Sequence, residues 1–138
     1  MTPRLALSAA LAASVLLGGS SSVHAAPAAL YGVQDDAWLH HGPGKLNSRL
    51  AELDRLGVDV VRYTVRWDDV AATRPVTPRD PRDRGYDWRK TDAVLRGLRR
   101  HGIEVVLTLY GTPSWANGGL SANWAPTSSQ AFGDFARA

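Results

Sequence analysis

The sequence predicts an α/β fold built on parallel strands, and two observations carry that prediction. Two apolar, β-branched runs of strand length occupy 58–65 and 103–109, and each follows a glycine that ends an amphipathic helix. Each run then enters a long loop rich in aromatic and charged residues. Strands that alternate with helices in this way form parallel sheets, so we expect a binding site on the loops after the strands.

Composition limits the classes of protein that fit. The 138 residues allow one ordinary domain, and 44% hydrophobic with 21% charged residues is typical of globular chains. The net charge is +3, and the arginines of 79–100 are interleaved with aspartates, which favours a solvated surface over a nucleic-acid interface. The absence of cysteine excludes disulfides and thiolate chemistry.

The N-terminus has the pattern of a signal peptide, predicted for 1–25. Arg4 supplies the positive charge, 5–17 is apolar, and Val23-His24-Ala25 ends in a cleavage site with small residues. The apolar run is short for a membrane span, so we expect a secreted protein without stable membrane insertion and a mature domain at 26–138. An uncleaved N-terminal anchor is the alternative.

The first elements follow from local pattern. A short strand is predicted at 30–33, followed by an acidic loop at 34–36. A helix is predicted at 45–56, ended by Gly57, and leads to the strand at 58–65. Four leucines are predicted to share the buried face of that helix: Leu46, Leu50, Leu53 and Leu56.

The connection at 66–86 contains three prolines and is predicted to be irregular. Asp87 is the expected N-cap of a helix at 88–101 that Gly102 ends. Its predicted buried stripe is Trp88, Thr91, Val94, Leu95 and Leu98.

After the strand at 103–109 comes a loop at 110–126, and the capping-box pattern of 127–130 predicts a third helix with no stop signal before Ala138. The order β-α-β-α-β-α predicts three adjacent parallel strands joined by right-handed crossovers. Such a sheet needs cover on both faces, so we expect the first three βα units of a larger, incomplete barrel.

Several cofactor motifs fail on inspection. Gly42-Pro43-Gly44-Lys45 lacks the Ser or Thr that a phosphate loop needs after its lysine. No Gly-x-Gly-x-x-Gly follows the first strand, which argues against a dinucleotide site. The adjacent His40 and His41 diverge in any regular backbone, so we predict neither a metal nor a cofactor.

Strand alternation selects candidate site residues at the strand ends. It places Arg62 and Thr64 on one face of the second strand, and Thr108 and Tyr110 at the mouth of the third. In a barrel Arg62 would lie among apolar neighbours, where a guanidinium needs a partner. Arg62 therefore serves either a structural ion pair or the orientation of an active-site carboxylate.

Three tryptophans fall in the predicted loops. Trp67, Trp115 and Trp124 have flat rings suited to stacking on the C–H face of a sugar, and Trp115 is the strongest candidate. Loop tryptophans also serve as plugs over the helix layer of a barrel, so both interpretations stay open.

Three stretches together resemble a known family. Leu56–Trp67, Tyr86-Asp87-Trp88 with the helix after it, and Leu107–Ala116 resemble the second strand, second helix and third strand of clan A glycoside hydrolases, especially the cellulase-like family 5 and family 39 enzymes. The resemblance spans about 30–138. It implies a (β/α)8 TIM barrel with the site at its top face.

The resemblance also implies retaining hydrolysis by two carboxylates about 5 Å apart. In the family these carboxylates follow the fourth and seventh strands, so no catalytic residue is assigned here. Arg62 matches the arginine that supports the nucleophile, and Trp115 matches a subsite aromatic. Tyr110 stands where many members have histidine. Four strand-end aspartates match no catalytic position: Asp35, Asp36, Asp68 and Asp69.

The sequence therefore predicts a secreted O-glycosyl hydrolase of β-linked saccharides, present here without its catalytic carboxylates and so inactive. The predicted substrate-binding residues are Arg62, Tyr110, Trp115 and Trp67. The alternatives are a carbohydrate-binding remnant of a barrel and an unrelated open-sheet α/β hydrolase or binding protein. The expected partner is a carbohydrate, and no oligomeric state follows from the sequence.

Overall fold

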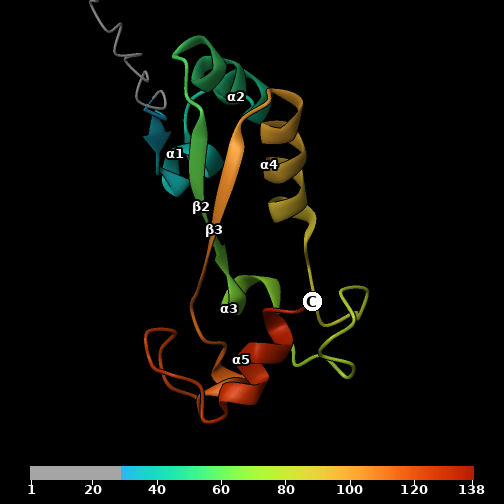
Figure 1. Ribbon diagram of the computed structural model, residues 1–138. Helices are drawn as coiled ribbons and strands as arrows, with labels where there is room; N and C mark the ends of the chain where they lie inside the picture. The colour runs from blue at the N-terminus through green and yellow to red at the C-terminus, as the bar shows by residue number, and fades with distance from the viewer. Residues whose placement is uncertain (1–28) are drawn as a thin grey trace, which may run out of the picture.

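A computed structural model describes residues 29–138, so the predicted signal peptide at 1–25 lies outside the described residues. Three parallel strands form one sheet in the order β1-β2-β3 (Figure 1). They are β1 (Gly32–Val33), β2 (Val60–Arg66) and β3 (Glu104–Tyr110). The prediction of an α/β fold with adjacent parallel strands is confirmed, although β1 has only two residues.

Five α-helices and one 3-10 helix accompany the described strands. They are α1 (Asp36–His41), α2 (Leu46–Arg55), α3 (Trp67–Val70), α4 (Arg89–Arg100), η1 (Ser114–Ala116) and α5 (Ser129–Phe135). The helices predicted at 45–56 and 88–101 are confirmed as α2 and α4. No helix among the described residues is both long enough and apolar enough to cross a membrane.

The helices pack on one face of the sheet. Val61, Tyr63 and Val65 of β2 are at most 3% exposed and meet the buried side chains of α2 and α4. The two helices approach closely, because a Cβ added to Gly97 of α4 would lie 2.2 Å from Leu50 Cδ1 of α2. This core accounts for the apolar stripes that the sequence predicts.

The other face of the sheet is open. The alternate residues of β2, Arg62 and Arg66, are exposed, and so are Val106 and Tyr110 of β3. The predicted alternation of β2 is therefore confirmed. The predicted apolar surroundings of Arg62 are wrong for the described residues, because nothing in 29–138 covers this face of its strand.

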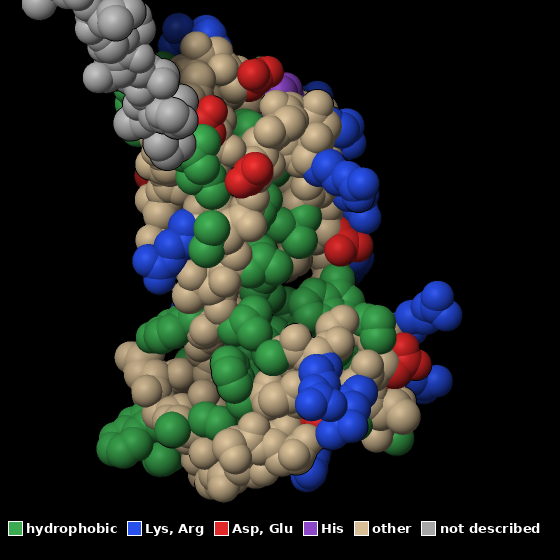
Figure 2. All heavy atoms as spheres, in the orientation of Figure 1, with side chains coloured by type: hydrophobic (Ala, Val, Ile, Leu, Met, Phe, Trp, Pro, Cys, Tyr) green, Lys and Arg blue, Asp and Glu red, His purple; other side chains and the backbone are tan. Residues whose placement is uncertain are grey.

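The same core extends beyond the carboxyl ends of β2 and β3, where α3 and α5 meet and aromatic side chains gather (Figure 1). Trp67 is stacked on Phe135 with ring centroids 5.3 Å apart, and Trp115 meets the same indole edge-on at 5.5 Å. Trp88 is stacked on Phe135 at 5.9 Å and links the cluster to α4. In Figure 2, hydrophobic side chains gather between the sheet and this lower part.

Three local predictions are wrong. Leu56 is 60% exposed because α2 ends at Arg55 and the chain turns away through Gly57. Trp88, not Asp87, is the N-cap residue of α4, although Asp87 Oδ1 accepts from the Arg89 amide at 3.1 Å. The predicted third helix is confirmed as α5, but its capping box does not form. Ser128 is the N-cap residue without a side-chain bond, Thr127 Oγ1 donates to the Ala116 carbonyl, and Gln130 Nε2 donates to Asp134.

The short helices α1 and α3 are not predicted: α1 starts at the end of the predicted loop at 34–36, and α3 lies within the predicted irregular connection at 66–86. Asp35 caps α1 through Oδ1, which accepts from the Trp38 amide at 2.8 Å, so the acidic segment begins a helix. Helix α3 begins directly at the end of β2 and carries Trp67 and Val70 into the core. The strand-end region is therefore more ordered than the sequence predicts.

Candidate functional site

Arg62 and Thr108 meet on the open face of the sheet. The Arg62 Nε–H donates to Thr108 Oγ1 at 2.8 Å, across the β2–β3 pair. Arg62 makes no ion pair within residues 29–138, so the structural ion pair is wrong for the described chain. Its two terminal nitrogens have no bonding partner there, which leaves a fixed guanidinium facing solvent.

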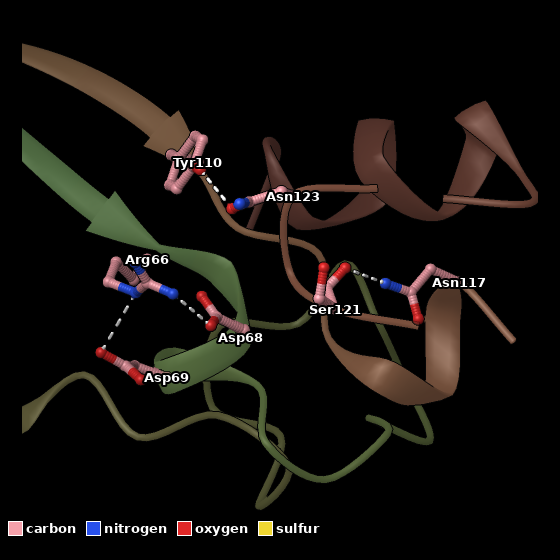
Figure 3. A network of polar contacts seen from close by, with 7 residues as sticks. All are labelled: Arg66, Asp68, Asp69, Tyr110, Asn117, Ser121 and Asn123. Carbon is pink, nitrogen blue, oxygen red and sulfur yellow. Dashed lines mark hydrogen bonds and ion pairs between the residues drawn. The ribbon is translucent and has the colours of Figure 1, made fainter. Parts of the chain in front are cut away.

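Further along β2, Arg66 holds two aspartates at the start of α3 (Figure 3). Arg66 Nη2 lies 2.5 Å from Asp68 Oδ2, and Nε lies 3.6 Å from Asp69 Oδ2. The Asp68 carboxylate raises the pKa of Arg66 through this hydrogen bond. Arg66 is therefore paired with carboxylates of α3, unlike Arg62.

Tyr110 ends β3 on the same face, as predicted. The Arg66 guanidinium carbon lies 5.6 Å from the centroid of the Tyr110 ring, and the Tyr110 hydroxyl donates to Asn123 Oδ1 at 2.5 Å. Figure 3 shows Tyr110 and Asn123 pointing toward one another from the strand end and the following loop. The placement of Tyr110 is confirmed, whereas its role in binding stays a prediction.

Gly111, directly after β3, allows the end of this strand to pack closely against the start of α3. Gly111 has φ +79°, and a Cβ added there would lie 2.1 Å from Asp68 Oδ1. The Asp68 amide in turn donates to the Gly111 carbonyl at 3.2 Å. Asp68 Oδ1 is buried and has no hydrogen-bond partner among the described residues. Only glycine fits the backbone angle and the contact at this position.

Trp67 is not available to a ligand. Its side chain is 1% exposed within the aromatic cluster, and it begins α3 in place of a loop. The prediction that Trp67 binds a sugar from a loop is therefore wrong. The strand end turns directly into a helix, which carries the indole inward against Phe135.

Trp115 lies in η1 and is half-buried. Its indole N–H donates to the Ala71 carbonyl at 2.7 Å, and the Arg74 guanidinium carbon lies 5.8 Å from its ring centroid. Together with the edge contact to Trp67, these interactions give Trp115 a structural position. The sequence ranks Trp124 below it, but Trp124 is 61% exposed.

A cavity of about 400 Å³ lies between α1, α3 and the start of α4, and it shares Arg66 and Asp69 with the strand-end site. In its wall the Tyr63 hydroxyl lies 3.1 Å from His40 Nε2. Burial, followed by the nearby His41, lowers the pKa of His40, and burial raises the pKa of Tyr63. The sequence gives no sign of this pair, because α1 is not predicted.

The strand-end aspartates have structural partners. Asp35 caps α1, Asp36 Oδ1 accepts from the Thr64 amide at 2.9 Å, and Asp68 and Asp69 face Arg66. Among residues 29–138 no group of three potential metal-ligating side chains comes together.

Comparison with known proteins adds no family assignment. No protein-family model matches the sequence, and no curated protein matches it at a significant level.

Proposed function

We propose that the chain is a secreted glycoside hydrolase whose three βα units belong to a (β/α)8 barrel. In this proposal the open face of the sheet and the loops after β2 and β3 contact a β-linked poly- or oligosaccharide. The described residues supply binding groups, and the two carboxylates of a retaining mechanism are not among them.

The observation that carries the proposal is a row of groups on the open face, running from Arg62 in the middle of β2 to Tyr110 at the carboxyl end of β3. Arg62 with Thr108, followed by Tyr110 with Asn123, presents hydrogen-bonding groups beside an aromatic ring on one face. Ligands of parallel α/β sheets bind at this edge of the sheet. Sugars need both polar groups for their hydroxyls and flat rings for their C–H faces.

Arg62 is suited to a charged or strongly polar partner. Because Nε is held by Thr108, the planar guanidinium is oriented, and its terminal nitrogens form a fork for a carboxylate. In a retaining hydrolase that carboxylate is the nucleophile. Arg62 would then act as a positioning residue and not as a catalytic one.

The test separates binding from turnover. We expect the 138-residue chain to bind cello-, xylo- or manno-oligosaccharides in calorimetric titrations, and to release no product from aryl β-glycosides above the uncatalysed rate. Arg62→Met should weaken binding, whereas Arg55→Met, at an exposed arginine of α2, should not. Absence of binding to every β-linked ligand would overturn the proposal.

A non-catalytic carbohydrate-binding protein is the second candidate. The contacts of the four strand-end aspartates favour this candidate. Asp35 caps a helix, Asp36 accepts from a backbone amide, and Asp68 and Asp69 face Arg66, so each already has a structural partner. Saccharide binding by a protein that includes all of its natural chain, without any hydrolysis, would select this candidate over the hydrolase.

A further inference from the structure

The loop at 117–126 after β3 presents one aromatic ring to solvent, and we propose that Trp124 on this loop is the platform on which a saccharide ring stacks. The inference rests on the proposed function and assigns the stacking role to Trp124 in place of Trp67 and Trp115. The ligand class is a neutral pyranose unit of a β-linked chain.

Exposure separates Trp124 from the other candidate rings. Trp124 is 61% exposed, against 1% for Trp67, and within residues 29–138 no hydrogen bond or ring contact engages its indole. Trp115 has its N–H bonded and Arg74 over its ring. Among these three tryptophans, only Trp124 offers a ring largely free for a ligand.

The loop that carries Trp124 is held in one shape. Asn117 is 3% exposed, and its side-chain amide makes two hydrogen bonds within the loop. Its Nδ2 donates to the Ser121 carbonyl at 2.9 Å, and its Oδ1 accepts from the Leu120 backbone amide at 3.0 Å. Figure 3 shows the contact between Asn117 and Ser121. The Trp124 amide itself donates to the Ser121 carbonyl at 3.0 Å.

Further backbone bonds tie the loop to the strand end. The Thr112 amide donates to the Ala122 carbonyl at 2.9 Å, and the Thr127 amide donates to the Ala116 carbonyl at 2.8 Å. Hydrophobic side chains protrude at the lower left of Figure 2, where Figure 1 places this loop. A ring on a tied loop loses little conformational entropy on binding, which is the property of a preorganised platform.

Polar groups beside the ring match the rim of a sugar. Asn123 precedes Trp124, and its Oδ1 is occupied by the Tyr110 hydroxyl. This bond orients the Asn123 amide, whose Nδ2 has no bonding partner among the described residues. A pyranose has an apolar C–H face and a rim of hydroxyls, so the indole and the neighbouring amide donor fit its two surfaces.

Oligosaccharide titration of matched variants tests the platform. Cello-, xylo- and manno-oligosaccharides are titrated into the wild-type chain, Trp124→Ala, Trp124→Phe and Leu120→Ala, with maltohexaose as the α-linked comparison. Leu120 is the matched control, because it is 51% exposed on the same loop. Circular dichroism checks that all four proteins are folded.

We expect Trp124→Ala to weaken binding about tenfold, as the loss of one stacked ring predicts. Trp124→Phe should retain part of the affinity, and Leu120→Ala should bind as the wild type does. Acrylamide quenching of the wild-type tryptophan fluorescence should fall when ligand is bound, and this protection should disappear in Trp124→Phe.

Two contrary results are distinguishable. Wild-type binding that Trp124→Ala leaves unchanged would overturn the platform while the proposed function stands. Absence of saccharide binding by the wild-type chain would overturn the proposed function and the platform with it.

Discussion

At the scale of single residues, Trp67 and Trp115 have structural contacts, whereas Trp124 faces solvent. Trp67 is stacked on Phe135 and is 1% exposed, so its removal leaves a large cavity. We expect Trp67→Ala to lower the free energy of unfolding by about 3–5 kcal/mol. Trp124→Ala should change it by less than about 0.5 kcal/mol. Urea denaturation of both variants measures the difference, and equal effects would contradict the assignment.

The His40–Tyr63 contact predicts a pH dependence of stability. The folded state lowers the pKa of His40, mainly through burial, below the value of about 6.5 of an unfolded histidine. As the pH falls through that value, the unfolded chain binds more protons than the folded chain, so the free energy of unfolding decreases. The stabilisation is complete above this value and is lost below it.

Denaturation of His40→Gln at several pH values checks this expectation. Glutamine keeps a hydrogen-bonding side chain beside Tyr63 but does not titrate. The variant should therefore lose less stability than the wild type between about pH 7 and pH 5. An identical pH profile for the two proteins would show that His40 does not contribute.

Strand alternation predicts which residues of β2 and β3 share a face, because the period of two is a property of the backbone. It therefore places Arg62, Thr108 and Tyr110 on one face correctly. It does not find the difference between Trp67 and Trp124. That difference depends on Phe135, far along the chain, which buries one ring and not the other.

At the scale of elements, Gly111 controls how the end of β3 meets the start of α3. A Cβ there would lie 2.1 Å from Asp68 Oδ1, in addition to the strain of φ +79°. Gly102 has φ +68° with no atom within 4 Å of an added Cβ, so it isolates the backbone strain. We expect Gly102→Ala to cost about 1–2 kcal/mol and Gly111→Ala more. Thermal unfolding of the pair measures this, and equal costs would refute the contact.

Arg49 joins α1 to α2. Its guanidinium, in a residue 7% exposed, donates to the carbonyls of Leu39 at 3.0 Å, Gly42 at 2.7 Å and Gly44 at 2.6 Å. Arg49→Met leaves these acceptors without their donor and should lower the free energy of unfolding by about 1–3 kcal/mol. Arg55→Met removes only an exposed contact to Glu52 and should have little effect, as chemical denaturation of both variants will test.

The long helices could be predicted because an apolar stripe and a terminal glycine define each of them. The short helices could not, because α1 depends on one side-chain cap and α3 on burial of Trp67 and Val70 against distant residues. The Asp35 cap was visible as a residue type. The six residues that follow it are too few to show the apolar periodicity that identifies a helix in sequence.

At the scale of the whole molecule, helices pack on one face of the sheet and cover β2 there, although Leu107 of β3 on that face is 50% exposed, and the other face carries the candidate site. The order of the strands and their direction follow from the alternation of elements, so this arrangement could be predicted. The aromatic cluster that positions η1 and α5 could not, since it joins residues from 67 to 135 through tertiary contacts alone.

The most direct test of the account is an NMR titration of the isotopically labelled chain with a β-linked oligosaccharide that it binds. A saccharide bound at the proposed site should change the amide shifts of 62–66, 108–111 and 121–124, on β2, the end of β3 and the Trp124 loop. The amides of α2 and α4 on the covered face should stay unchanged. Shift changes confined to those helices, or none with any β-linked ligand, would contradict the saccharide site.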